Sequence, residues 1–223
     1  MRAVVVGAGP GLSASFARAL AGAGYGVTLV ARRTDKLREL AHTIGAETRT
    51  CDATDAAAVD ALFAGAPAPD VVLFNASYRV RGPFLGLDPV EVQRTLTVSA
   101  FAGFLVAQAA ARAMAQAGRG TILLTGASAS VKGYAQSAPF AMGKFALRGL
   151  AQSMARELHP QGTHIVHVVV DGGIRSAARP DPADRPDSLL DPDAIAQTML
   201  DLVRQPRSVW TDEIAVRPWV ERF

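Results

Sequence analysis

Three glycines near the start of the chain have the spacing of a turn that binds a dinucleotide. Gly7, Gly9 and Gly11 follow the apolar run 3–6, and Leu12 opens an alanine-rich stretch that favours a helix. Glycines let a backbone turn tightly and approach a diphosphate, whose charge then meets the free N–H groups at the positive end of the helix. Leu12 stands where the G-x-G-x-x-G pattern has its last glycine. A tight turn without a ligand is the alternative, but a strand before the turn and a helix after it favour a diphosphate site.

A second apolar run, about twenty residues further on, ends in Arg32 and Arg33. An acidic residue at this place accepts a hydrogen bond from the ribose of NAD, whereas arginine accommodates the 2′-phosphate of NADP. Guanidinium groups bind phosphate through planar, charge-assisted hydrogen bonds. The pair therefore favours NADP as the cofactor. NAD stays open as the alternative, because arginines at strand ends are often only solvated and Asp35 lies near enough in sequence to meet a ribose.

The elements that would position these residues alternate along the chain. Short β-branched runs and longer alanine-rich stretches are typical of parallel βαβ units. We expect strands, mostly buried on both faces, at 3–6, 27–31, 47–51, 71–75, 121–125, 165–170 and 213–216. We expect helices at 11–23, 34–43, 56–64, 90–117, 139–158 and 191–205. The pattern predicts an α/β fold with one doubly wound, seven-stranded parallel sheet and helices on both faces.

Composition limits the remaining possibilities. The 223 residues are 49% hydrophobic, which suits one domain over 1–223 with a sizeable core. The net charge of +3 does not indicate a nucleic-acid partner, and the longest uncharged stretch, 95–111, is shorter than the roughly 20 apolar residues of a membrane span. The single cysteine, Cys51, excludes an intrachain disulfide, and no Cys or His spacing suits a metal site. We therefore expect a cytoplasmic protein without a metal, nucleic-acid or membrane partner.

One low-complexity segment, 175–190, is rich in Pro, Asp, Arg and Ala. A loop of this length in a compact α/β chain is often a substrate lid. We expect such a lid here, with an uninvolved surface connection as the alternative.

Together these elements resemble the short-chain dehydrogenase/reductase family over nearly the whole chain. The family's Gly-x-x-x-Gly-x-Gly turn is similar to Gly7 and Gly11, with Ser13 in place of the third glycine. The resemblance implies a Rossmann fold and an adenine contact by the acidic residue after the third strand. It further implies cofactor contacts in the segments similar to Asn-Asn-Ala-Gly and Pro-Gly-x-x-x-Thr. The contacts so implied are Asp52, Asn75, Ala76, Gly172, Ile174 and Ser176.

The acid of this family is missing from its usual place. Hydride transfer to a carbonyl leaves an alkoxide, which a positioned donor must protonate. The family's Tyr-x-x-x-Lys motif is matched by Phe140 and Lys144, and phenylalanine cannot donate a proton. The place of its Ser falls on Ala127, and that of its Asn on Ser99. The resemblance implies that Lys144 still holds the nicotinamide ribose through its ammonium group.

Three hydroxyl groups are the substitute candidates for catalysis. Tyr78 lies just beyond the fourth expected strand, Tyr134 lies in the loop before the helix of Phe140, and Ser128 is the neighbour of Ala127. We expect Ser128 to donate a hydrogen bond to the substrate. Either tyrosine is a candidate acid, although tyrosines near loops are often packing residues.

These residues predict an NADP(H)-dependent oxidoreductase that transfers hydride to or from a small organic substrate with a non-standard proton donor. The first alternative is a nonenzymatic NADP(H)-binding sensor or partner protein. The second is cofactor-independent lyase chemistry on the same scaffold, which the absence of bulky residues from the glycine turn disfavours. Because similar proteins pair their long helices, we also expect a homodimer or homotetramer.

Overall fold

The computed structural model describes residues 1–221, and its centre is a seven-stranded parallel sheet in the order β3-β2-β1-β4-β5-β6-β7. The order reverses between β1 and β4, as in a doubly wound fold. The expected strands and fold class are confirmed, with strand bounds that differ from expectation by two residues at most. The strands are β1 (Arg2–Val6), β2 (Gly26–Ala31), β3 (Glu47–Thr50), β4 (Val71–Phe74), β5 (Gly120–Thr125), β6 (Thr163–Val170) and β7 (Glu213–Val216).

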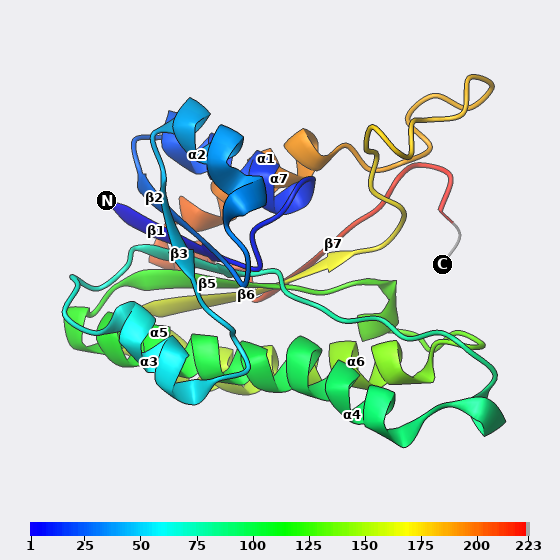
Figure 1. Cartoon of the computed structure of the whole chain (residues 1–223). Helices are drawn as coiled ribbons and strands as arrows, with labels where there is room; N and C mark the ends of the chain where they lie inside the picture. The colour runs from blue at the N-terminus through cyan, green and yellow to red at the C-terminus, as the bar shows by residue number, and fades with distance from the viewer. Residues whose placement is uncertain (222–223) are drawn as a thin grey trace.

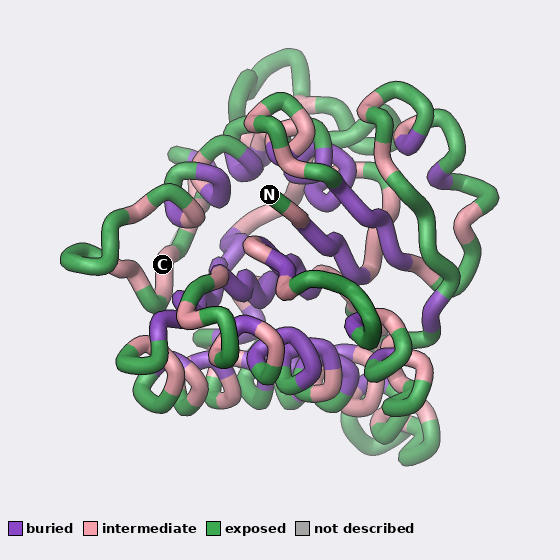
Figure 2. Tube along the Cα trace, turned by 90° about the vertical axis from the view of Figure 1, so that its left-hand side faces the viewer, coloured by how far each residue is buried: buried purple, intermediate pink, exposed green. Residues whose placement is uncertain are grey.

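Helices cover both faces of the sheet (Figure 1). One face carries α1 (Leu12–Gly22), α2 (Arg38–Ile44) and α7 (Pro192–Val203). The other carries α3 (Ala56–Phe63), α4 (Pro89–Leu96), α5 (Ala102–Ala117) and α6 (Ala138–Leu158). A core lies on each side because strand side chains alternate between the faces: Val5 packs in the core of α1, and Val4 in the core of α5. Figure 2 shows buried strands in the middle and exposed loops around them.

Strand β3 departs from the expected apolar pattern. All four of its residues are exposed, whereas every residue of β4 is buried. The difference follows from position, because β3 forms one edge of the sheet and β4 lies near its centre. An edge strand with charged side chains also resists pairing with other chains.

The expected helix 90–117 is interrupted by a π-helical turn, Thr97–Phe101, between α4 and α5. Ser99 is buried in this turn, where its Oγ accepts from the backbone nitrogen of Tyr78 at 3.1 Å and donates to the carbonyl of Tyr78 at 3.3 Å.

The stretch 89–117 is the one helical stretch in residues 1–221 that is long and apolar enough to cross a membrane. Half of its most apolar window is buried, so it is a core helix of this fold.

Candidate active site

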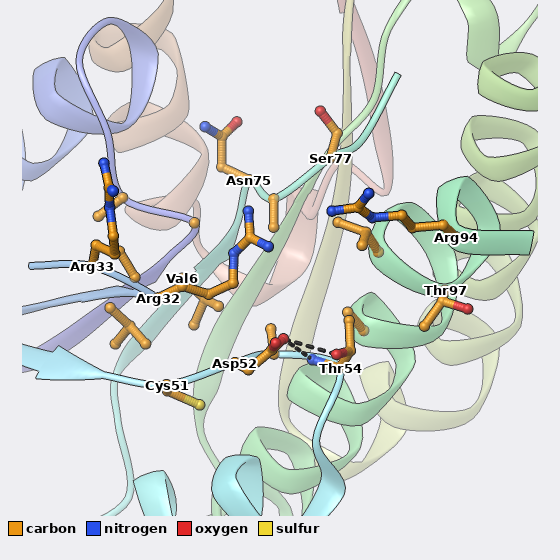
Figure 3. A pocket seen from close by; sticks show the side chains of 18 of the residues that line it. Val6, Arg32, Arg33, Cys51, Asp52, Thr54, Asn75, Ser77, Arg94 and Thr97 are labelled. Carbon is orange, nitrogen blue, oxygen red and sulfur yellow. Dashed lines mark hydrogen bonds between the residues drawn. The ribbon is translucent and has the colours of Figure 1, made fainter. Parts of the chain in front are cut away.

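The carboxyl ends of the parallel strands bring most of the predicted site residues to one edge of the sheet. Two cavities, of about 1150 and 580 Å³, lie side by side there and share Asn75 and Ser77. The first, shown in Figure 3, is lined by Gly7, Arg32, Arg33, Asp52, Asn75 and Ala76. The second is lined by Gly11, Leu12, Asn75, Lys144, Gly172, Ile174 and Ser176. Of the predicted cofactor contacts, only Gly9 lines neither cavity.

The glycine turn has the backbone that its residue types predict. Gly7 and Gly11 have φ of +80° and +92°, in a region that side chains disfavour. A Cβ on Gly7 would overlap the backbone nitrogen of Ala76, so this glycine lets β1 and the end of β4 approach closely. Space is open around Gly11, where a Cβ would meet no atom within 4 Å. The turn is therefore packed tightly against the sheet at Gly7 and open toward the second cavity at Gly11.

Ser13, at the place of the family's third glycine, closes the turn with its side chain. Its Oγ accepts from the backbone nitrogen of Gly9 and donates to the carbonyl of Gly9, both at 3.0 Å. The helix α1 begins at Leu12, and no side chain caps its first N–H groups. Such an uncapped start leaves donors and a partial positive charge for an anion.

Cations gather at the outer end of the first cavity. Arg32, Arg33 and Lys36 line it from the chain just after β2, and the exposed Arg33 has only a loose ion pair, 3.9 Å from Asp35. In Figure 3, Arg32 and Arg94 extend into the cavity from opposite sides. Three cations that line one cavity can supply the donors that a phosphate group requires.

Asp52 lies on the floor of the same cavity as a carboxylate. It accepts from the backbone nitrogen of Thr54 at 3.0 Å and from its Oγ1 at 2.8 Å. These hydrogen bonds, and to a smaller extent the charge of Arg32, hold the pKa of Asp52 below its ordinary value. Asp52 is therefore ionised at neutral pH and can accept a further hydrogen bond.

Lys144 lies on α6 at the inner end of the second cavity. Its Nζ donates to the carbonyl of Thr125 at 2.7 Å, and burial lowers its pKa from 10.5 to about 8. The same Nζ is 5.7 Å from the ring centroid of Phe140, one helical turn earlier. The structure thus places a buried ammonium group beside a ring that has no hydroxyl.

The candidate catalytic hydroxyls are divided between two environments. Ser128 and Tyr134 line the second cavity with Lys144. Tyr78 lines neither cavity: its hydroxyl donates to Glu91 Oε2 at 2.6 Å, and this hydrogen bond raises its pKa above the ordinary value. The guanidinium of Arg94 covers its ring at 4.4 Å. Ser128 and Tyr134 therefore share a site with Lys144, and the Tyr78 hydroxyl does not.

Several lining residues were not predicted from the sequence. They are Lys36 and Arg94 in the first cavity and Arg79, Arg81 and Arg179 in the second. Lys36 and the Arg-Val-Arg segment 79–81 could have been predicted from the sequence, because each lies a few residues beyond the end of an expected strand. The carboxyl ends of those strands form the site. Arg94 could not have been predicted, because it comes from a helix distant in sequence.

Comparisons with known proteins point to one family. The family model described as short chain dehydrogenase matches residues 1–184. A trans-4-hydroxycyclohexanecarboxylate dehydrogenase of Sinomonas cyclohexanicum is 32% identical over 73% of this chain and 68% of its own length. A cyclic-di-GMP-binding biofilm dispersal mediator protein of Escherichia coli is 31% identical over 79% of this chain and 74% of its own length.

Solved structures agree as well. The crystal structure of a metagenomic short-chain oxidoreductase in complex with NADP is 30% identical, superposes with a TM-score of 0.86, and covers 99% of this chain and 98% of its own. The residues matched by the family model include the glycine turn, Asp52 and Lys144. This chain belongs to the short-chain dehydrogenase/reductase family.

Proposed function

We propose that this chain is an oxidoreductase that uses NADP(H) to transfer hydride to or from a small organic substrate. The observation that carries the proposal is a cleft formed by the two adjoining cavities. The uncapped, glycine-rich start of α1 lines the second cavity, and the cations Arg32, Arg33 and Lys36 line the first. The solved relative in complex with NADP supports the choice of nucleotide. The relative named for trans-4-hydroxycyclohexanecarboxylate supports a small organic substrate.

The residues present fit an NADP molecule along the cleft. The open space around Gly11 and the free N–H groups of α1 suit its diphosphate, and Arg32 and Arg33 suit the 2′-phosphate. Asp52 accepts from the adenine, and Lys144 donates to the nicotinamide ribose. Such a cofactor, when bound, supplies or accepts the hydride.

The proton then comes from a non-standard donor. Phe140 has no proton to give, so Ser128 and Tyr134, which line the second cavity, are the proposed substrate-facing hydroxyls. Ser128 orients the substrate oxygen, and Tyr134 is the candidate acid. Tyr78 is a third candidate that would first have to release Glu91.

Three further proposals concern the whole molecule. Residues 1–223 act as one NADP-binding domain, with the irregular segment 175–190 as a lid; this segment leaves the sheet edge that carries the site (Figure 1). The chain works as a homodimer or homotetramer, for which the exposed and mutually stacked Phe101 and Phe104 provide an apolar contact. Its single cysteine suits a reducing cytoplasm.

A nonenzymatic NADP(H)-binding sensor is the second candidate function. The residues Phe140 and Ala127, which stand at the places of the family's Tyr and Ser, favour it. The relative named as a cyclic-di-GMP-binding biofilm dispersal mediator protein supports it, because that name describes binding and no reaction. In this case nucleotide would change association with a partner, and co-purification with and without NADPH would detect it.

Stopped-flow loss of NADPH absorbance tests the enzymatic proposal. The panel consists of simple ketones and of three easier classes: quinones, compounds with activated C=C bonds and compounds with activated C=N bonds. The three easier classes demand less of the acid than a simple ketone does. We expect turnover with at least one class and none in the Lys144→Met variant. No turnover with any class, together with intact NADPH binding, would favour the sensor.

A further inference from the structure

The second cavity is lined by positive side chains and by no acidic ones in the described part of the chain. Its cations are Arg79, Arg81, Lys144, Arg175 and Arg179. Arg175 is already neutralised, because its guanidinium contacts Asp181 at 3.1 Å and Asp191 at 2.5 Å outside the cavity. Arg79 and Arg81 have no carboxylate within ion-pair distance among residues 1–221. The cavity therefore has unbalanced positive charge.

The backbone that carries Arg79 and Arg81 is held at both ends. Ser99 fixes Tyr78 through two hydrogen bonds, and the backbone nitrogen of Gly82 donates to the carbonyl of Gln136 at 3.2 Å. Exposure alternates between these anchors, with Arg79 and Arg81 more exposed than the residues beside them. Residues two apart in an extended segment point to the same side. Both arginines therefore line the cavity from segment 78–82, whose backbone is held at its two ends.

Phe140 gives one of these guanidinium groups a platform. The Arg79 Cζ lies 4.8 Å from the centroid of the Phe140 ring, which suits a cation–π contact. This contact holds the guanidinium over the ring, and a guanidinium so held can still donate through its N–H groups to a planar anion. Partial burial and the neighbouring charge of Arg81 also lower the pKa of Arg79, as expected for paired cations that lack a counter-ion.

The segment after β6 adds a third cation to the cavity. The Arg179 guanidinium lies directly over Gly173, where a Cβ would come within 2.5 Å of its Cζ and Nη1. Arg179 contributes to the cavity from the segment after β6, whereas Arg79 and Arg81 contribute from the segment after β4. An anion in the cavity is therefore attracted by cations from two separate segments of the chain.

We propose that Arg79 and Arg81 bind a carboxylate of the substrate, with Phe140 as a positioning residue that orients Arg79. The proposal rests on the proposed function and names its substrate class, a small organic acid. A carboxylate matches the fork of a guanidinium through two parallel hydrogen bonds. The competing occupant is the cofactor diphosphate, whose donors are supplied instead by Gly11 and the start of α1. The two occupants are separated by the NADPH affinity of a variant that lacks both arginines. This affinity falls if the arginines bind the diphosphate, and it stays unchanged if they bind a substrate carboxylate.

Isothermal titration with cyclohexanecarboxylate and its neutral match, cyclohexanecarboxamide, tests the proposal. Both probes are titrated with saturating NADP and without nucleotide. We expect the wild type to bind the carboxylate about tenfold more tightly than the amide. The Arg79→Gln/Arg81→Gln variant loses this preference, and Arg79→Lys/Arg81→Lys keeps part of it. The charge-matched control Arg112→Gln/Arg156→Gln, whose exposed arginines line neither cavity, keeps all of it.

Three results would overturn the proposal. They are equal affinity of the wild type for both probes, including no measurable binding of either; a preference that survives Arg79→Gln/Arg81→Gln; and a loss of NADPH affinity in that variant with carboxylate binding unchanged. A wild type that fails to bind NADPH refutes the proposed function instead, because the titrations without nucleotide still decide the carboxylate site.

Discussion

The buried Lys144 makes the stability of the fold depend on pH in a way that Lys144→Met removes. Its Nζ has one hydrogen bond, to the Thr125 carbonyl, and no carboxylate partner among the described residues. Burial lowers its pKa from 10.5 to about 8. Because the unfolded chain then binds this proton more tightly than the folded chain, protonation of Lys144 opposes folding.

The size of the effect follows from the two pKa values. Each pH unit between them corresponds to about 1.4 kcal/mol, so at pH 7, where Lys144 is protonated in both states, the charge costs about 3 kcal/mol of stability. The cost shrinks as the pH rises above about 8 and disappears above 10.5, where the amine is neutral in both states. The free energy of unfolding of the wild type, relative to Lys144→Met, therefore rises by about 2 kcal/mol between pH 7 and pH 10.

Urea unfolding followed by circular dichroism at pH 7, 8.5 and 10 measures this difference. Lys36→Met is the matched control, because Lys36 is an exposed lysine and should leave the pH dependence of the wild type unchanged. Lys144→Met also loses the hydrogen bond to the Thr125 carbonyl. This loss lowers the free energy of unfolding by a similar amount at every pH, so it has little effect on the difference in pH dependence. The same pH dependence in the wild type and Lys144→Met would refute a buried, charged lysine.

The remaining predictions concern the cofactor turn, the 2′-phosphate site and the missing acid. Arg32→Asp weakens NADPH binding about 10- to 100-fold in a fluorescence titration, because a charge-assisted hydrogen bond is lost, and leaves NADH binding nearly unchanged; a parallel loss for both nucleotides would contradict the assignment. Phe140→Tyr places a phenol beside Lys144, and weak NADPH-dependent reduction of ketones appears where the wild type shows none; unchanged inactivity would show that the added phenol alone cannot replace the family's acid. Gly7→Ala lowers the free energy of unfolding by about 2 kcal/mol, because its φ is +80° and its Cβ would overlap the Ala76 backbone. Gly9→Ala, whose Cβ would meet no atom within 4 Å, keeps the wild-type stability, and an equal loss in both would argue against that overlap.

Local sequence signals predicted most of the fold. Apolar runs bounded by glycine, proline or polar residues marked most of the strands, because burial on both faces demands such runs. The π-helical turn at Thr97–Phe101 was not predicted, since it depends on a contact between Ser99 and Tyr78, 21 residues apart. The exposed β3 shows the same limit: whether a strand lies at an edge is decided by the topology of the whole sheet.

The site was predictable where the backbone alone determines it. Glycine positions and the ends of parallel strands place the turn, Arg32 and Asp52 in one cleft whatever their side chains do. The environment of Tyr78 was not predictable, because its segment is irregular and its hydroxyl turns to Glu91 on α4. For the same reason the sequence did not reveal Arg79 stacked on Phe140, a contact between two segments distant in the chain.

A fluorescence titration of the wild-type chain with NADPH and with NADH tests the central claim most directly. The cations at the end of β2 predict saturable binding of NADPH, at least about tenfold tighter than that of NADH. Equal affinity for the two nucleotides would contradict the role of Arg32 and Arg33, and no saturable binding of either would contradict the cofactor cleft itself.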